Sequence, residues 1–277
     1  MPLLLGVLDG HGTSGQRVSD LVKGAFPRYL LAARGDSGAT PWEEAIKQAA
    51  ERTNKDVKSM CGDVSASGTT MVVAMVFQSG EVLMINVGDS RAVAAELCGD
   101  ARAFKRLTRD HKPEEASENA RILGAGGKVH PLMYRGMEIG PNRVWLASDD
   151  APGLCMTRSF GDTTAARVGV IAEPELSRYQ VDLEANDAVM LCMCTDGVFE
   201  FLEDDQVTSR VAKAERGHDF TDVVDELLEE SRELWIENEE DCIDDCTAVL
   251  AIFSRAKAGE KVAEAAAEIN GAVANVH

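Results

Sequence analysis

An aspartate and a histidine separated by glycine follow directly on the first apolar run of the chain, in Leu3-Leu4-Leu5-Gly6-Val7-Leu8-Asp9-Gly10-His11-Gly12. A short run of Leu and Val is typical of a strand buried on both faces, although a buried helix shows the same pattern. Asp9 would then end the strand, and the glycines allow a sharp turn beside His11. Because the ordinary pKa of histidine lies near neutrality, His11 suits proton transfer. Taken alone, the pattern is equally typical of a β-turn closed by a solvated aspartate.

The same arrangement recurs once later in the chain, and a third carboxylate group lies at the opposite kind of boundary, before an apolar run. The apolar run 188–194 is followed by Thr195-Asp196-Gly197, and Asp244-Asp245 come just before the apolar run 248–253. If these strand ends are neighbours, three or more carboxylates share one cleft and cannot all stay ionised without a positive partner. Oxygen ligands of this kind are preferred by Mg²⁺ and Mn²⁺. The sequence therefore predicts a centre for a hard divalent cation.

Length and composition indicate one large domain. The chain has 277 residues, 45% of them hydrophobic, with no low-complexity linker. No apolar stretch approaches the length of a membrane span, and the N-terminus lacks the basic region and cleavage site of a secretory signal. We therefore expect no membrane partner.

Charge and cysteine content indicate which partners and which cellular compartment to expect. The net charge is −19, from 28 basic and 47 acidic residues, which argues against nucleic acid as a partner. Phosphate binding would then need a local positive charge, which a bound cation supplies. The seven cysteines include no CxxC pair. We therefore expect reduced thiols, a cytoplasmic or nuclear protein and a monomer.

The elements expected around these residues are helices and strands in separate groups. Residues 15–31 and 40–60 carry apolar residues at helical spacing, and 71–77, 81–87 and 91–97 are expected as an antiparallel meander. Residues 113–123, 204–214 and 220–237 are expected as helices, and 247–253 as a last strand. Such grouping favours an α+β layered fold over alternating βαβ units. Residues 130–171 show no period and are expected to be irregular.

Nine motifs in order resemble the metal-dependent Ser/Thr protein phosphatases of the 2C type. They are GVLDGHG (6–12), SGTT (67–70), NVGDSRAV (86–93), LTRDHKP (107–113), ENARILGAGGKV (118–129), PGLCMTRSFGD (152–162), EPE (173–175), CTDGVFEFL (194–202) and DDCTAV (244–249). Any one of them is weak evidence, whereas nine in family order are strong. The flap form, RVW followed by PGLCMTRSFGD, is similar to members from plants and protists.

The resemblance implies a four-layer α-β-β-α sandwich, with two antiparallel sheets flanked by helices and a two-metal centre at one end. It implies a catalytic domain over 1–255, with the flap at about 130–171, and an Ala/Glu-rich tail over 256–277 that we expect to be helical. Asp9 resembles the bridging metal ligand, and Gly10 resembles the residue that gives a backbone carbonyl. Asp196 and Asp244 resemble the other carboxylate ligands.

Further roles follow from the same resemblance. Asp110 resembles a ligand of a third, weaker metal site, and Glu200 stands where that site often draws on Asp. His11 resembles the general acid that protonates the departing serine or threonine oxygen; the alternative is a turn histidine bonded to a carboxylate. Two metals activate a bridging hydroxide for in-line attack. We also expect two architectural ion pairs, Asp89 with Arg91 and Arg158 with Asp162.

One departure from the family pattern bears on activity. Members normally carry, before the DGHG strand, a strand with a phosphate-contacting Arg and a Glu-Asp pair, and this chain begins eight residues before Asp9. Either the sequence is truncated there or the protein lacks those groups. The first hypothesis is a phosphoserine/phosphothreonine hydrolase acting on phosphoproteins with Mg²⁺ or Mn²⁺. The second is a phosphatase-like regulatory or binding domain with weak or no turnover. An unrelated two-metal phosphodiester hydrolase is a distant third.

Overall fold

The computed structural model describes residues 1–35, 38–148, 151–214, 219–239, 243–255 and, by backbone alone, 268–276. Its helices are α1 (Gly15–Arg34), α2 (Trp42–Met60), α3 (Ala116–Gly124), α4 (Asp196–Phe199), α5 (Asp204–Val211) and α6 (Phe220–Asn238), with a 3₁₀ turn at Ala165–Val168. Its strands are β1 (Leu3–Val7), β2 (Gly10–His11), β3 (Gly68–Thr69), β4 (Met71–Val76), β5 (Glu81–Val87), β6 (Arg91–Cys98), β7 (Ala101–Arg106), β8 (Lys128–Tyr134), β9 (Met137–Trp145), β10 (Pro152–Leu154), β11 (Phe160–Gly161), β12 (Glu175–Gln180), β13 (Ala188–Cys194), β14 (Cys246–Ser254) and β15 (Glu268–Val276).

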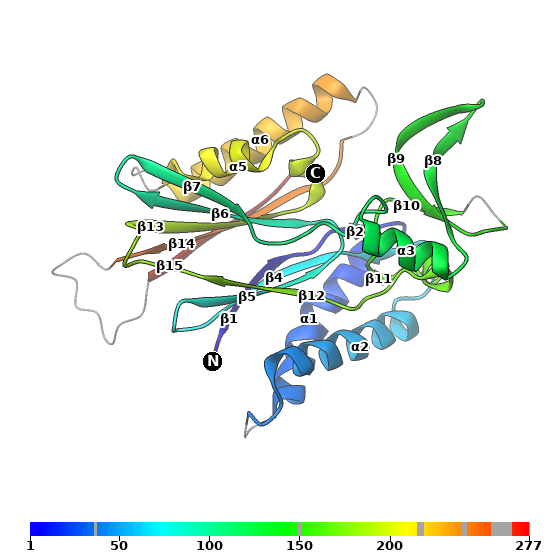
Figure 1. Cartoon of the computed structure of the whole chain (residues 1–277), viewed down its shortest axis with the longest axis horizontal. Helices are drawn as coiled ribbons and strands as arrows, with labels where there is room; N and C mark the ends of the chain where they lie inside the picture. The colour runs from blue at the N-terminus through cyan, green and yellow to red at the C-terminus, as the bar shows by residue number, and fades with distance from the viewer. Residues whose placement is uncertain (36–37, 149–150, 215–218, 240–242, 256–267, 277) are drawn as a thin grey trace.

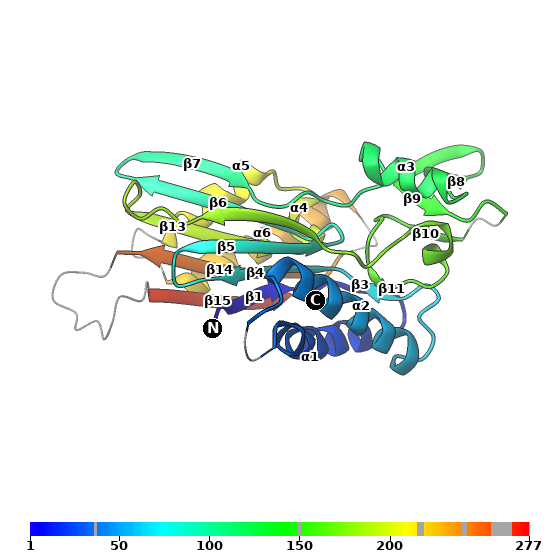
Figure 2. The same ribbon diagram turned by 60° about the horizontal axis from the view of Figure 1, so that its bottom comes forward.

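Two antiparallel sheets form the centre of the molecule. One sheet has the strand order β1-β4-β5-β12, and the other has the order β15-β14-β13-β6-β7. Helices α1 and α2 cover the outer face of the first sheet, while α5 and α6 cover that of the second (Figure 1). Figure 2 shows α1 and α2 together on one side of the sandwich. The predicted four-layer α-β-β-α fold is confirmed.

The sequence of the central strands follows from burial on both faces. In β4, Met71, Val73 and Met75 pack toward α1 and α2. The alternate residues Val72 and Ala74 pack toward the second sheet instead. Because successive side chains point to opposite faces, a strand between two apolar layers reads as a continuous apolar run. The same rule explains the runs that end at Asp9 and Asp196.

The predicted meander is wrong at its second connection. Strands β4 and β5 do pair as a hairpin, with Val76 opposite Val82. Strand β6, however, pairs with β13 in the other sheet. The Gly88-Asp89-Ser90 link therefore crosses between the sheets. A short polar link has the same appearance in sequence whether it joins neighbouring strands or carries the chain to a facing sheet.

The segment expected to be irregular contains a long hairpin. Strands β8 and β9 pair from Lys128 opposite Trp145 to Tyr134 opposite Met137, and β10 adds a third strand. The outer part of the hairpin is exposed on both faces, so no period marks it. Pro131 and Pro141 obscure the pattern further, because proline lacks the donor that a ladder needs; the register shifts at Pro131.

The predicted helical tail is wrong for residues 268–276. They form β15, which pairs antiparallel with all of β14, from Cys246 opposite Val276 to Ser254 opposite Glu268. Pairing satisfies the backbone groups along β14, and this outweighs the helical propensity of Ala and Glu. Residues 256–267 lie outside the described residues. Within the described part of the chain, no helix is long and apolar enough to cross a membrane.

Candidate metal centre

Asp9 is held rigidly at the end of β1. Its amide donates to Thr70 Oγ1 at 3.1 Å, and its carbonyl accepts from Thr70 N and Thr69 Oγ1, both at 2.9 Å. The next residue, Gly10, lies so close to α1 that a Cβ there would be 2.6 Å from Gly15 O. The DGHG and SGTT motifs thus lock one another, and the Asp9 carboxyl projects from a fixed backbone.

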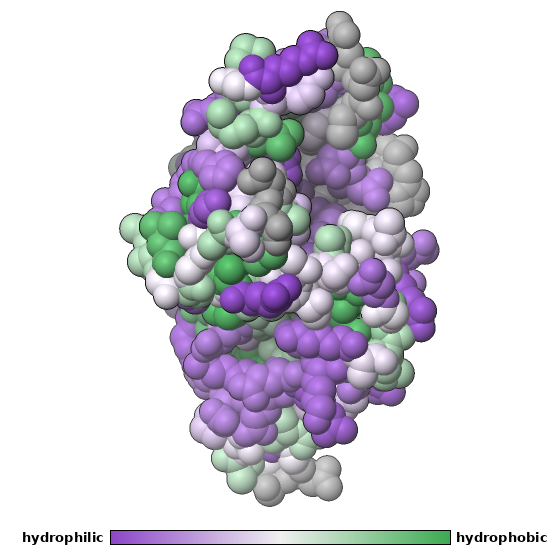
Figure 3. Space-filling view, turned by 90° about the vertical axis from the view of Figure 1, so that its right-hand side faces the viewer, coloured by the Kyte–Doolittle hydropathy of each residue, from purple (hydrophilic) through white to green (hydrophobic). Residues whose placement is uncertain are grey.

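Asp196 and Asp244 come from the adjacent ends of β13 and β14. Thr195 joins these ends, because its hydroxyl donates to Asp245 O at 3.0 Å and accepts from Thr247 N at 3.0 Å. Asp196 begins α4, and Asp244 accepts from the amide of Asp245 at 2.9 Å. The three aspartates adjoin the C-terminal ends of β1 and β13 and the N-terminal end of β14. These strand ends lie at the same end of the sandwich, toward the β8–β9 hairpin (Figure 1). Figure 3 looks onto this end, where hydrophobic patches lie among hydrophilic surface.

The carboxyl groups are close enough to oppose one another's ionisation. Burial, followed by repulsion and a hydrogen bond from Asp196, raises the pKa of Asp9 to about 9. Repulsion from Asp244 and Asp89 adds to this shift. The pKa of Asp244 is also raised, first by burial. The three predicted aspartates are therefore brought together, as a convergent metal centre requires.

The donor set fits a hard divalent cation. Among the described residues, no group of three or more Asp, Glu, His or Cys side chains is placed so that it could hold a metal ion. The groups that act on Asp9 are nevertheless all carboxylates, whose oxygens are the ligands that Mg²⁺ and Mn²⁺ prefer. Positive charge among them would relieve the repulsion that keeps Asp9 protonated.

Asp89 and Lys112 belong to this cluster, although the sequence reasoning missed both. Burial and then repulsion from Asp196 raise the pKa of Asp89 to about 6, against the opposing effect of Lys112. The Lys112 ammonium bonds to Asp89 Oδ2 and lies 3.7 Å from Asp196 Oδ2. Asp89 could have been predicted from the sequence, because it follows the apolar run of β5 as Asp9 follows β1. No sequence pattern other than the LTRDHKP motif indicated Lys112.

His11, on β2, is bonded to a carboxylate that directly follows β11, in the same small sheet β11-β3-β2. Its Nε2 lies 2.7 Å from Asp162 Oδ2, which also accepts from Ser159 Oγ at 2.6 Å. Burial alone would lower the pKa of His11, but the bond and charge of Asp162 outweigh it, so the pKa is raised. A Cβ at Gly68 would be 2.2 Å from Asp162 Oδ2, which explains the glycine of SGTT. The pair can hold a proton on the imidazole beside the aspartates.

A family model decides the identity of the fold and its motifs. The model named Protein phosphatase 2C matches residues 3–239. The chain belongs to the protein phosphatase 2C family. Protein relatives agree: Probable protein phosphatase 2C 72 of Arabidopsis thaliana is 35% identical over 219 residues, which are 75% of this chain and 64% of that protein. Probable protein phosphatase 2C 64 of Oryza sativa subsp. japonica is 37% identical over 217 residues, 76% of this chain and 49% of that protein. The chain thus spans about half to two thirds of these relatives.

Solved structures show the protein phosphatase 2C fold at lower identity. The crystal structure of a serine-threonine phosphatase 2C from Toxoplasma gondii matches with a TM-score of 0.72 and 20% identity, covering 91% of this chain and 84% of that one. A C. elegans sex determining protein matches with a TM-score of 0.66 and 20% identity, covering 89% of this chain and 55% of that one. At this identity the likeness supports the fold alone.

Asp110 and Glu200 lie differently from the other predicted ligands in this phosphatase 2C chain. The Asp110 carboxylate is held by Arg91, with Nη2 to Oδ2 at 2.6 Å, so it already has a cationic partner. Glu200 is exposed at the end of α4, close enough to Asp244 to raise the pKa of that group. A role for either residue in a third metal site remains a prediction.

Both predicted architectural ion pairs are wrong. Arg91 bonds Asp110 and Asp204, while Asp89 bonds Lys112. Arg158 bonds the buried Glu118 at 2.7 Å, and Asp162 bonds His11. In each case, side chains that are close in sequence reach opposite sides of a junction and find partners on other elements.

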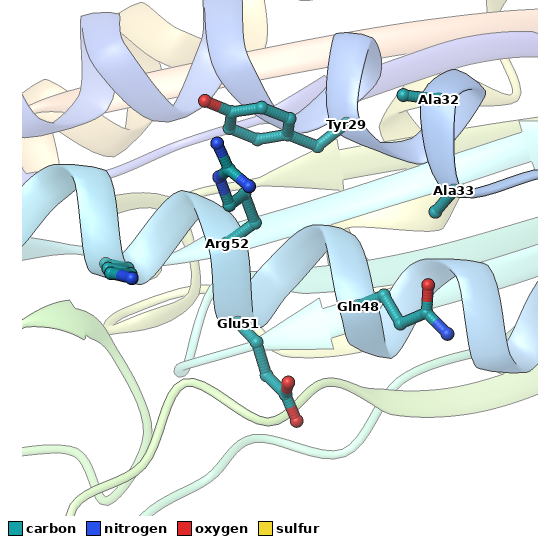
Figure 4. A pocket seen from close by; sticks show the side chains of 7 residues that line it. Tyr29, Ala32, Ala33, Gln48, Glu51 and Arg52 are labelled. Carbon is teal, nitrogen blue, oxygen red and sulfur yellow. The ribbon is translucent and has the colours of Figure 1, made fainter.

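The groove between α1 and α2 lies apart from this centre. It has a volume of about 390 Å³ and is lined by residues from both helices, among them Tyr29, Glu51, Arg52 and Lys55 (Figure 4). The Arg52 guanidinium lies 5.1 Å from the Tyr29 ring centroid. None of the aspartates of the centre lines this groove.

Proposed function

We propose that this chain hydrolyses phosphoserine and phosphothreonine in proteins with Mg²⁺ or Mn²⁺. The observation that carries the proposal is the convergence of Asp9, Asp196 and Asp244, expressed in the raised pKa of Asp9. Carboxylates that repel one another at a cleft bind divalent cations, which in turn attract a phosphoryl group. Membership of the protein phosphatase 2C family supports the same reaction.

Asp9, Asp196, Asp244 and the Gly10 carbonyl would hold two cations. These ions, when bound, lower the pKa of a water and neutralise the phosphoryl oxygens. The remaining work falls to His11, which gives a proton to the departing serine or threonine oxygen. Asp162 occupies Nε2, whereas Nδ1 is buried without a hydrogen-bond partner among the described residues. Nδ1 is therefore the nitrogen we assign to proton donation.

We also propose an intracellular location and a phosphoprotein partner. The six described cysteines are all free, four of them buried. Reduced thiols are the usual state of cysteine inside the cell.

The decisive experiment is metal-dependent turnover of a phosphothreonine peptide. The wild-type protein is expected to hydrolyse it with Mn²⁺, and Asp196→Asn is expected to reduce kcat/KM at least about 10²-fold, because a catalytic metal supplies several kcal/mol of transition-state stabilisation. Asp205→Asn is the matched control, since this carboxylate is exposed on α5.

Two outcomes would contradict the proposal. A folded wild-type protein with no metal-dependent turnover would favour a regulatory or binding domain. Turnover of bis(p-nitrophenyl) phosphate without turnover of the phosphopeptide would favour a phosphodiester hydrolase.

A further inference from the structure

Arg143 is an arginine with an unused donor at the base of the β8–β9 hairpin. It lies opposite His130 in the ladder. Its side chain is half-buried, and Nη1 donates to Gly153 O at 2.8 Å. Its Nε is buried and has no hydrogen-bond partner in the described structure. A buried N–H without an acceptor carries its full desolvation cost, so such a group calls for a ligand.

The charge of Arg143 is also uncompensated among the described residues. Other arginines around the cleft hold carboxylates: Arg91 binds Asp110, and Arg158 binds Glu118. Across the described ranges, no carboxylate lies within ion-pair distance of Arg143. Among the described residues, the guanidinium therefore has no competing carboxylate for an anion that comes from outside.

Arg143 and the metal centre are linked through the segment 153–157. Gly153, its acceptor, begins a short segment that reaches Thr157, whose amide donates to His111 O at 2.7 Å, next to Lys112. Four residues of extended chain span roughly 13 Å. Cys155 lies midway along this segment. Burial raises the pKa of its thiol. Arg143 and Lys112 act to lower that pKa, whereas Asp89 and Asp196 act to raise it. Arg143 and the aspartates thus flank the same thiol.

The guanidinium is positioned by a rigid base. Trp145 stacks on His130 with ring centroids 5.3 Å apart and donates Nε1 to the His130 carbonyl at 2.9 Å. Gly153 has φ +73°, and a Cβ there would be 2.8 Å from the Trp145 ring. Because the base is packed in this way, little freedom is lost when Arg143 binds a ligand.

We propose that Arg143 is a substrate-binding residue that donates hydrogen bonds to the phosphoryl oxygens of the substrate. The inference rests on the proposed phosphatase function and names a residue that binds at the same site. Lys112 is less available for this role, because Asp89 and Asp196 already hold its ammonium. The planar fork of arginine matches phosphoryl oxygens better than a lysine does.

The test compares Arg143→Met and Arg143→Lys with the wild-type protein. With Mn²⁺, Arg143→Met is expected to lose about 10- to 100-fold in kcat/KM, the range for a hydrogen bond to a charged group, mainly through a higher KM. The loss should be similar for p-nitrophenyl phosphate and for a phosphothreonine peptide, because both share the phosphoryl group. Arg143→Lys should recover part of it. Arg135→Ala, at the exposed hairpin tip, is the matched control and should change neither constant.

A binding measurement separates this inference from the proposed function. Calorimetry on the Mn²⁺-loaded protein should show weaker binding of inorganic phosphate to Arg143→Met than to wild type, by a similar factor. If the wild type binds phosphate but hydrolyses no ester, the proposed hydrolytic function is wrong. The comparison of phosphate affinity between wild type and Arg143→Met would still test the role of Arg143. Unchanged phosphate affinity and KM would overturn the inference. A loss of kcat/KM confined to peptides with glutamate beside the phosphothreonine would overturn it too, because Arg143 would then contact that carboxylate and not the phosphoryl group.

Discussion

At the scale of the residue, a variant of the bond between His11 and Asp162 distinguishes proton donation by His11 from catalysis by the metals. Asp162→Asn removes the charge that orients the imidazole and raises its pKa. General acids contribute about 10²- to 10⁴-fold, so we expect kcat on a phosphothreonine peptide to fall by at least about tenfold. Hydrolysis of p-nitrophenyl phosphate should fall much less, because its leaving group needs no proton. Equal losses on the two substrates would contradict the role of His11.

The pH profile of the same variant gives an independent check. Asp162 raises the pKa of His11, so removing its charge lowers that pKa. The protonated acid is lost as pH rises through the pKa. The alkaline limb of kcat/KM for the peptide should therefore move to lower pH in Asp162→Asn. Ser159→Ala keeps the Asp162 charge and should leave the limb nearly in place.

Residue patterns predicted the acids of the centre but not their partners. Asp9, Asp196 and Asp244 could be found because each adjoins an apolar run that must be a buried strand. Their ion-pair partners could not be predicted, because a long side chain pairs with groups that the fold brings near it from distant parts of the sequence. Arg91 bonds Asp110, 19 residues away, in preference to Asp89, two residues away.

At the scale of the element, buried Glu118 joins α3 to the segment just before β11. It accepts from Arg158 at 2.7 Å, from Arg121 at 2.6 Å and from Thr157 Oγ1 at 2.6 Å. Glu118→Gln would leave these half-buried arginines without their carboxylate partner, at an expected cost of about 3–5 kcal/mol in unfolding free energy. Denaturant titration measures this cost. Glu114→Gln, at an exposed carboxylate, should be nearly neutral.

The pH dependence of stability tests the same carboxylate, because its lowered pKa predicts that stability falls as pH falls. The bonds from Arg121, Arg158 and Thr157 outweigh burial and hold the pKa of Glu118 well below its usual value of 4.5. Its contribution to stability is therefore complete above about 4.5 and is lost as pH falls below that value. Between pH 5 and 3 the wild type should lose more stability than Glu118→Gln. Parallel curves would show that the pKa of Glu118 is the same in the folded and the unfolded protein.

The elements themselves were predictable where burial imposed a period. Helices α1 and α2 and strands β4, β5 and β13 were found because each has at least one buried face. The β8–β9 hairpin was missed because most of its outer side chains meet solvent. β15 was missed because backbone pairing with β14, rather than its own composition, decides its conformation.

At the scale of the whole molecule, the fold gathers aspartates whose repulsion only a cation relieves. The pKa of Asp9 is raised to about 9 by burial and by its neighbours. A raised pKa means that Asp9 stabilises the metal-free native state most below the usual aspartate pKa of 3.8. This contribution is lost as pH rises through about 9. The metal-free protein should therefore lose stability as pH rises from 6 to 9, whereas Asp9→Asn should lose much less.

Binding of Mn²⁺ should reverse this behaviour, because a cation that replaces the Asp9 proton stabilises the native state alone. Thermal unfolding of the wild type should shift to higher temperature with Mn²⁺, more at pH 8 than at pH 6, with release of about one proton per Asp9 site. Asp9→Asn should abolish the shift, while Asp205→Asn should keep it. A shift of the same size in Asp9→Asn would mean that Mn²⁺ binds elsewhere and that Asp9, Asp196 and Asp244 do not form the metal centre.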